Sequence, residues 1–164
     1  MTDQWTSVPS ERVVELAQAL VDLPWPVAVE DITPLLEELG WVEIAPDLYT
    51  YTTGLEITPD LATAAKAQGE LTSIDVNLVD YDKEPSEERE EFVKDVGGSN
   101  VLALSDVFGE SEIPPFPRQS DIAFWNLPNG ARLSHIVTPK MVTLWVDSPR
   151  MAAAKRTIAK NPEL

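Results

Sequence analysis

The sequence contains no cysteine and a single histidine, His135. Without cysteine there is no disulfide, no thiol nucleophile and no thiolate ligand for a metal. One histidine among carboxylates is a poor ligand set for zinc, and any catalytic triad would depend on that one residue. Glycine-rich phosphate loops and the nucleophile elbow of hydrolases are also missing. We therefore expect no metal, no cofactor and no catalytic residue, so a protein that is not an enzyme.

Basic residues are scarce. The chain has 12 Lys and Arg against 28 Asp and Glu, which gives a formal net charge of -16. Such a chain repels polyanions, so nucleic acid and anionic membranes are not expected partners. The same field attracts a protein partner with a basic surface and speeds its encounter. Solubility alone is the other explanation of the acidity, and the composition does not decide between the two.

Long apolar runs are absent as well. No 18 consecutive apolar residues occur, so no membrane-spanning helix is expected. The opening "MTDQWTSVPSERVVELAQAL" lacks the basic start and the uninterrupted apolar core of a signal peptide. We therefore expect a cytoplasmic protein. Its 164 residues show no linker and no internal repeat, which predicts a single domain over 1–164.

Periodicity and turn residues predict the elements. The pattern indicates helices at 8–23, 30–41, 82–98, 99–109 and from 149, strands at 41–45, 48–57 and 70–82, and three more strands between 121 and 149. A hairpin is expected around Pro46 and Asp47. Residues 59–69 fit a loop or a helical turn, and 110–120 an extended connector. The expected fold is α+β, with about six strands in a mostly antiparallel sheet and helices packed on one side.

The closing stretch "DIAFWNLPNGARLSHIVTPKMVTLWVDSP" predicts a three-stranded meander. Asn129-Gly130 is a strong signal for a two-residue turn, and Pro139-Lys140 supplies a second turn. This register places His135 opposite Leu144 on an apolar face, where a buried, neutral histidine bonded to a backbone carbonyl is expected. It also places Ser134 between Trp125 and Trp145 on the other face. A slip of one residue in either turn would invert a strand.

The row formed by Trp125 and Trp145 has two interpretations. It is either a second core layer covered by a helix or an exposed aromatic anchor for a protein partner. On the second interpretation the contact also includes Ile136 and Met141, which share this face, and the acidic residues of 75–91. The full predicted partner-binding set is Trp125, Trp145, Ile136, Met141, Asp75, Asp80, Asp82, Glu84, Glu87, Glu88 and Glu91. For the run "SEEREE" within it, a solvated helix face is the simpler explanation.

Three segments resemble a known group of proteins: "LLEELGW", "SIDVNLVD" and the closing meander. Together, over roughly 35–148, they resemble the small acidic immunity proteins that actinobacteria encode beside secreted polymorphic toxins. The resemblance implies a stable cytosolic domain that binds its cognate toxin and blocks the active site, and we expect it to be monomeric when free. A secretion chaperone that holds an export substrate is the alternative. An enzyme acting on a small molecule is a third, and it would need a carboxylate-lined pocket and an accessible His135.

Overall fold

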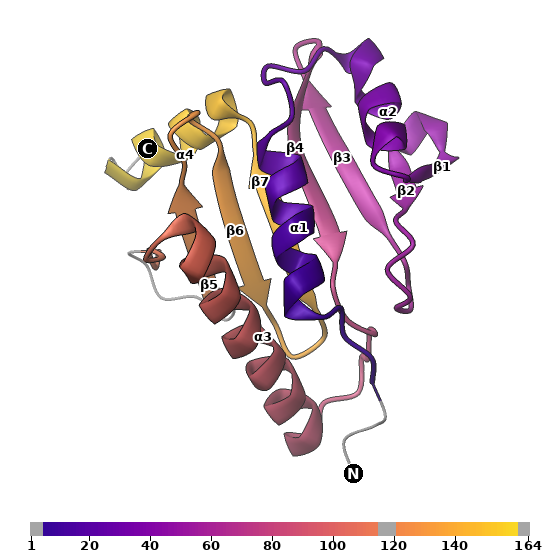
Figure 1. Ribbon diagram of the computed structural model, residues 1–164, viewed down its shortest axis with the longest axis vertical. Helices are drawn as coiled ribbons and strands as arrows, with labels where there is room; N and C mark the ends of the chain where they lie inside the picture. The colour runs from indigo at the N-terminus through magenta and orange to yellow at the C-terminus, as the bar shows by residue number, and fades with distance from the viewer. Residues whose placement is uncertain (1–4, 115–120, 161–164) are drawn as a thin grey trace.

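All seven strands of the described chain lie in one antiparallel sheet (Figure 1). The computed structural model describes residues 5–114 and 121–160. Its strands are β1 (Val42–Ala45), β2 (Thr50–Thr52), β3 (Ala62–Ala67), β4 (Glu70–Asn77), β5 (Asp121–Asn126), β6 (Arg132–Val137) and β7 (Val142–Asp147). Its helices are α1 (Ser10–Val21), α2 (Val29–Glu38), α3 (Glu87–Phe108) and α4 (Pro149–Lys160), with a short 3-10 turn, η1 (Pro46–Leu48). The expected α+β architecture is confirmed.

Two meanders build the sheet, whose strand order is β1-β2-β3-β4-β7-β6-β5. The first four strands follow each other in space as they do in sequence, and the last three form a second meander that joins the first through β4 and β7. The predicted hairpin around Pro46 and Asp47 is present, because η1 links β1 to β2 there. The longest crossover is α3, which connects β4 to the opposite edge of the sheet (Figure 1).

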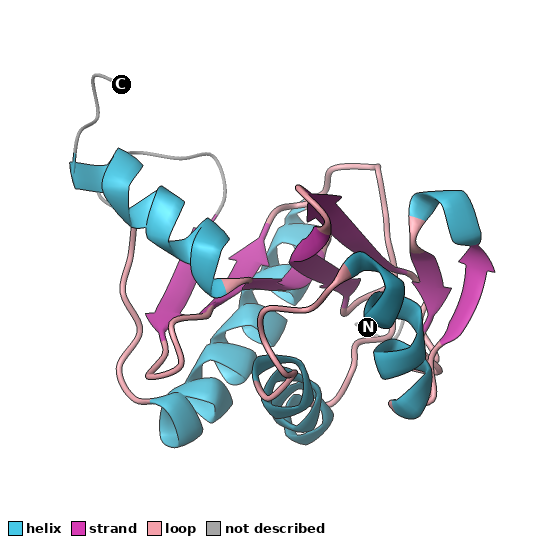
Figure 2. Ribbon diagram, turned by 90° about the horizontal axis from the view of Figure 1, so that it is seen from above, coloured by secondary structure: helices cyan, strands magenta, loops and turns pink. Residues whose placement is uncertain are grey.

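Helices occupy both faces of the sheet, but unequally. Figure 2 shows α1 and α3 on one side and α4 on the other. The α2 helix belongs with α1 and α3, since Thr33 of α2 bonds to Tyr51, whose ring is buried on that side. We call the side covered by α1, α2 and α3 the helical face and the opposite side the α4 face. This arrangement differs from the expected one in the placement of α4.

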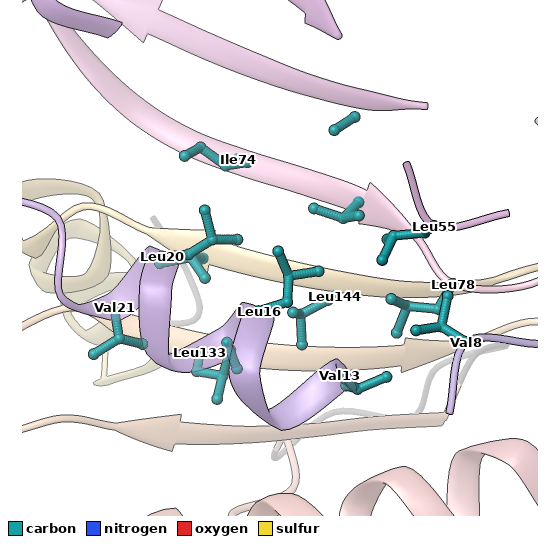
Figure 3. Close-up of a cluster of buried hydrophobic side chains, with 14 of the residues drawn as sticks. Val8, Val13, Leu16, Leu20, Val21, Leu55, Ile74, Leu78, Leu133 and Leu144 are labelled. Atoms are coloured by element: carbon teal, nitrogen blue, oxygen red, sulfur yellow. The ribbon is translucent and has the colours of Figure 1, made fainter. Parts of the chain in front are cut away.

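The hydrophobic core lies between the sheet and the helical face (Figure 3). Apolar residues of α1 recur at helical spacing and point inward, with Leu16 and Leu20 directed at Leu133 and Leu144 of the sheet. Each fully buried leucine contributes about 2 kcal/mol relative to an exposed one. On β4, Ile74 and Val76 point into this core, as the alternation predicts. Core packing therefore fixes which face each strand turns towards α1.

Two stretches of the chain, 59–69 and 82–109, differ in element type or number from the prediction. Residues 59–69, expected as a loop or helical turn, contain strand β3, which pairs with both β2 and β4. The two expected helices, 82–98 and 99–109, are one helix, α3, which begins after Ser86 and ends at Gly109. Gly97 and Gly98 lie inside it. Because of β3, the sheet has seven strands where six were predicted. Because α3 is one helix, the described chain has four α-helices where five were predicted.

None of the helices in the described segments is long and apolar enough to cross a membrane.

Candidate partner-binding surfaces

The first hairpin of the closing meander has a three-residue loop, so the predicted two-residue turn is wrong. The Leu127 N–H donates to the Ala131 carbonyl at 3.0 Å, and the Gly130 N–H donates back to the Leu127 carbonyl at 2.9 Å. A two-residue loop would require an N–H from Pro128 for its closing pair, and proline has none. Pro128 instead takes the second position of an ordinary turn, and Gly130, with φ of 93°, completes a glycine bulge.

The extra loop residue shifts β5 by one position and inverts its two faces. Trp125 pairs with Leu133, and Phe124 takes the place opposite Ser134 that was predicted for Trp125. Trp125 is therefore a core residue, 2% exposed, and its indole N–H donates to the Gly109 carbonyl at 2.8 Å. The predicted row of two tryptophans does not exist, and Trp125 leaves the candidate partner-binding set.

The second hairpin has the predicted register. Val137 pairs with Val142, His135 with Leu144 and Ser134 with Trp145. His135 is consequently buried in the core, as expected, and burial lowers its pKa to about 4. Its partner differs from the expected backbone carbonyl: the Asn100 amide on α3 lies 3.1 Å from Nε2.

Three of the predicted contact residues gather on the α4 face. Trp145 of β7 lies beside Asp75 of β4, and Ile136 of β6 lies in the next row of side chains. All three are partly exposed, as is Met141, which precedes β7. Burial raises the pKa of Asp75 above its ordinary value. The Trp145 indole N–H donates to Asp147 at 2.9 Å.

Two predicted contact acids, Asp80 and Asp82, are instead acceptors for the protein's own groups. Asp80 accepts hydrogen bonds from the backbone N–H groups of Thr6 and Thr58 at 2.8 and 2.9 Å. Asp82 accepts from the Glu84 backbone at 2.9 Å and from the Trp5 indole at 3.0 Å. Both bonds lower the pKa of Asp82, and the bond from the Glu84 backbone has the larger effect. Both carboxylates thus tie the segment before α3 to neighbouring chain.

The remaining acids of the predicted set are exposed on α3 or just before it. Glu84 precedes the helix, and Glu87, Glu88 and Glu91 lie in its first turns. The outward face of α3 continues with Asp95, Leu102 and Asp106 at helical spacing. We call this strip the α3 ridge: Glu87, Glu88, Glu91, Asp95, Leu102 and Asp106, all exposed.

Charge is divided between the two faces of the sheet. Helices α1, α2 and α3 together carry twelve acidic and three basic residues. Helix α4 carries four basic residues and no acidic one. Because the sheet lies between these layers (Figure 2), the acids of the α3 ridge and the aromatic ring of Trp145 face opposite directions. A single flat contact cannot bury both, so the contact expected from the sequence, to which both contribute, is divided between two faces.

Sequence reasoning missed the role of Arg89, which it left in a solvated run of charges. Its side chain is fully buried beneath the first turn of α3. The guanidinium donates to the carbonyls of Pro139, Asp80 and Lys140 at 3.0, 2.7 and 2.6 Å. Rings of Trp5 and Phe92 lie 5.2 and 5.4 Å from it. The available signal was its spacing of four residues from Val93, which places both on the inward side of the helix.

No cluster of three or more His, Asp or Glu suited to a metal occurs within residues 5–114 and 121–160. No curated protein and no solved structure matches the chain. A family model does match, over residues 11–148, and it is described as a family of unknown function, DUF6301. The match extends from α1 to the end of β7 and so includes the whole sheet and α3. The chain therefore belongs to the DUF6301 family.

Proposed function

We propose that this chain is an immunity protein, a cytoplasmic protein that binds a basic cognate toxin and covers its active site. The observation that carries the proposal is the α3 ridge, where Leu102 is 68% exposed between acidic neighbours. A large apolar side chain on an outward helix face gains free energy only when a partner covers it. An apolar contact inside a charged rim is the usual anatomy of a protein–protein interface.

Charge supports the choice of the α3 ridge. It lies on the side of the sheet where acidic residues outnumber basic ones by twelve to three in the helices. A toxin that acts on nucleic acid or a nucleotide presents a basic cleft to its substrate. An acidic helix can enter such a cleft and occupy the place of the polyanion, with its field speeding the encounter.

The acids and the apolar residue have different expected roles. Exposed charges at the rim of an interface mainly change the association rate, and they lose their effect as salt rises. Leu102, between Asp95 and Asp106 towards the C-terminal end of the ridge, would be desolvated on binding and would slow dissociation. The contact proposed from the sequence is thereby narrowed to α3, without Trp145.

The test is binding to the toxin-domain protein encoded by the neighbouring gene, measured by surface plasmon resonance at two salt concentrations. Replacing Glu87, Glu88 and Glu91 with glutamine should lower the association rate about tenfold at low salt. The matched control replaces Glu30, Glu37 and Glu38 of α2, which are also exposed and change the net charge equally. If both triple variants lowered the association rate equally, the change would be a general effect of net charge and would not support the α3 ridge as the contact.

A second pair of variants tests the anchor. Leu102→Asp should raise the dissociation rate about tenfold or more, because it replaces a covered apolar group with a charge. Leu48→Asp is the control, since Leu48 of η1 is 70% exposed and lies far along the chain from α3. Protection should follow binding: cells that express the toxin domain survive with the wild-type chain and die with Leu102→Asp. Survival with both variants would contradict the proposal.

The alternative of a secretion chaperone is favoured by a different observation, the partly exposed apolar residues of the α4 face. Trp145, Ile136 and Met141 would then hold the export substrate. Chaperones of this kind are usually dimers, so light scattering separates the two functions, with a monomer expected for the immunity protein. A neighbouring gene for an export substrate without a toxin domain, bound less tightly by Trp145→Ala, would favour the chaperone.

A further inference from the structure

Two arginines from different elements converge on the α4 face. Arg132 of β6 donates from Nε to the Asn126 side-chain oxygen at 3.1 Å, and Arg156 of α4 donates from Nη1 to the same oxygen at 3.2 Å. Two guanidinium groups therefore lie side by side at one neutral amide oxygen. Each has five N–H donors, and within residues 5–114 and 121–160 one donor of each is used in these bonds.

Neither arginine forms an ion pair within 4.0 Å in the part of the chain that the structure describes. Ion pairs there join Arg12 to Glu15, Arg150 to Glu70 and Lys155 to Asp147. Asp147 lies opposite Arg132 on the neighbouring strand and attracts it, but its carboxylate is paired with Lys155. Glu112 accepts from the Asn126 amide nitrogen at 2.9 Å. In a chain with more than twice as many acidic as basic residues, this pairing of like charges stands out.

An aromatic ring packs against one of the two arginines and holds its side chain in place. The Arg132 guanidinium lies 4.3 Å from the centre of the Phe124 ring, and both side chains are partly buried. Burial lowers the pKa of Arg132, and the charge of Arg156 acts in the same direction, while Asp147 and Glu112 oppose it. An anion would relieve this repulsion. A guanidinium already fixed by stacking also loses less conformational freedom when it binds one.

The surrounding charges indicate how many charges the anion carries. Around the pair, three basic groups face two acidic ones: Arg132, Arg156 and Lys155 against Asp147 and Glu112, with Lys155 paired to Asp147 at 2.9 Å. The excess is one positive charge, which a monoanion balances and a doubly charged phosphate exceeds. The planar fork of arginine also matches a carboxylate.

We propose that Arg132 and Arg156 form a binding site for a carboxylate, such as an Asp or Glu side chain of a bound polypeptide. The site is independent of the proposed immunity function, since it lies across the sheet from the α3 ridge. It gives the molecule a second recognition surface with the opposite charge preference. Within it, Asn126 is a positioning residue that holds the two guanidinium groups together.

The test follows the Nε–Hε resonances of Arg132 and Arg156 by NMR in the full ¹⁵N-labelled chain at constant ionic strength. The Arg132 resonance is identified by its absence from the spectrum of Arg132→Gln, and the Arg156 resonance by its absence from that of Arg156→Gln. The probes are N-acetyl-glutamate amide, its neutral glutamine analogue, acetate and inorganic phosphate. We expect both resonances to shift saturably with N-acetyl-glutamate amide and not with the glutamine analogue. Acetate distinguishes a free carboxylate from one on a peptide: tighter binding of acetate would overturn the polypeptide assignment.

Variants locate the effect. Arg156→Gln should weaken binding about fivefold, the range of an exposed charge-assisted contact. Glu112→Gln should strengthen it about threefold, because it removes the resident charge and keeps an acceptor for Asn126. Arg12→Gln, which changes the net charge as Arg156→Gln does but on exposed α1 surface, should leave binding unchanged. Absence of a saturable shift, equal weakening by Arg12→Gln, or tighter binding of phosphate would each overturn the proposal.

Discussion

Burial alone lowers the pKa of His135 to about 4, since its imidazole lies among core side chains between β6 and α3. The Ser10 hydroxyl donates to the Asn100 side-chain oxygen at 2.8 Å, and the Asn100 amide lies 3.1 Å from His135 Nε2. An amide can donate there only if Nε2 carries no proton, so the ring is neutral with its proton on Nδ1. Three elements thus share one buried hydrogen-bonded chain.

The first residue-scale prediction follows from this state of His135. The unfolded chain binds a proton near pH 6.5, whereas the folded protein does so only near pH 4. Stability therefore falls as pH falls through this window, by about 2 kcal/mol between pH 7 and pH 5. Urea unfolding should show this extra loss in wild type relative to His135→Gln, which does not titrate. As the only histidine, its ring resonance reports the pKa directly by NMR, and a midpoint near 6.5 would contradict burial.

Arg89 shows what residue-level pattern does not reveal. Its burial depends on three backbone carbonyls, from Asp80, Pro139 and Lys140, that no local pattern places near α3. Desolvation lowers the pKa of its guanidinium, while Asp82 and Asp80 act in the opposite direction. Its Nη1 has no hydrogen-bond partner within the described residues. The buried guanidinium joins the first turn of α3 to the backbone at one end of the sheet through these hydrogen bonds.

At the scale of elements, the close approach of α3 to β6 depends on one glycine. A Cβ at Gly97 would lie 2.6 Å from Val137 Cγ2, whereas a Cβ at Gly98 would meet nothing within 4 Å. Gly97→Ala should therefore destabilise the protein by about 2 kcal/mol through overpacking. Gly98→Ala should stabilise it by up to about 1 kcal/mol, because alanine favours the helix and meets open space. Chemical denaturation of the two variants gives both values.

The glycine pair also carries its own control. Both substitutions add the same methyl group to adjacent positions of one helix, so their difference isolates the contact with Val137. If Gly97→Ala were as stable as Gly98→Ala, α3 would not pack against β6 as closely as the structure has it. The same pair was expected to end the first of two helices, with the second beginning at residue 99. Helical propensity gave that expectation, and tertiary packing overrides it here.

Elements with strong alternation could be predicted, and those without it could not. The β4 pattern and the Pro139-Lys140 turn gave the correct faces because apolar side chains mark one side of each strand. Strand β3, "ATAAKA", has small side chains and no such contrast, so only its neighbours make it a strand. The first hairpin differs for another reason: Asn-Gly favours a two-residue turn, but Pro128 has no N–H for the closing pair of such a turn.

For the whole molecule, the sequence gives a total charge but not its distribution. The acids of α3 and the basic residues of α4 are both visible in the chain, yet their separation by the sheet follows only from the strand order. That separation divides the predicted contact set between two faces. Trp125 moves into the core, Trp145 and Asp75 stay on the α4 face, and Glu87, Glu88 and Glu91 lie on the helical face.

The last prediction is that the two surfaces act independently. The α3 ridge and the arginine pair lie on opposite sides of the sheet, and charges more than about 8 Å apart in water are largely screened at physiological salt. The triple glutamine variant of Glu87, Glu88 and Glu91 should lower the toxin association rate and leave carboxylate affinity at Arg132 and Arg156 within about twofold of wild type. Arg156→Gln should weaken carboxylate binding and leave the toxin association rate within about twofold of wild type. A combined variant should show the same change in each assay as the single variant that acts there, as expected for distant, independent sites. Measured coupling between the two surfaces would instead indicate one continuous interface that wraps around an edge of the sheet.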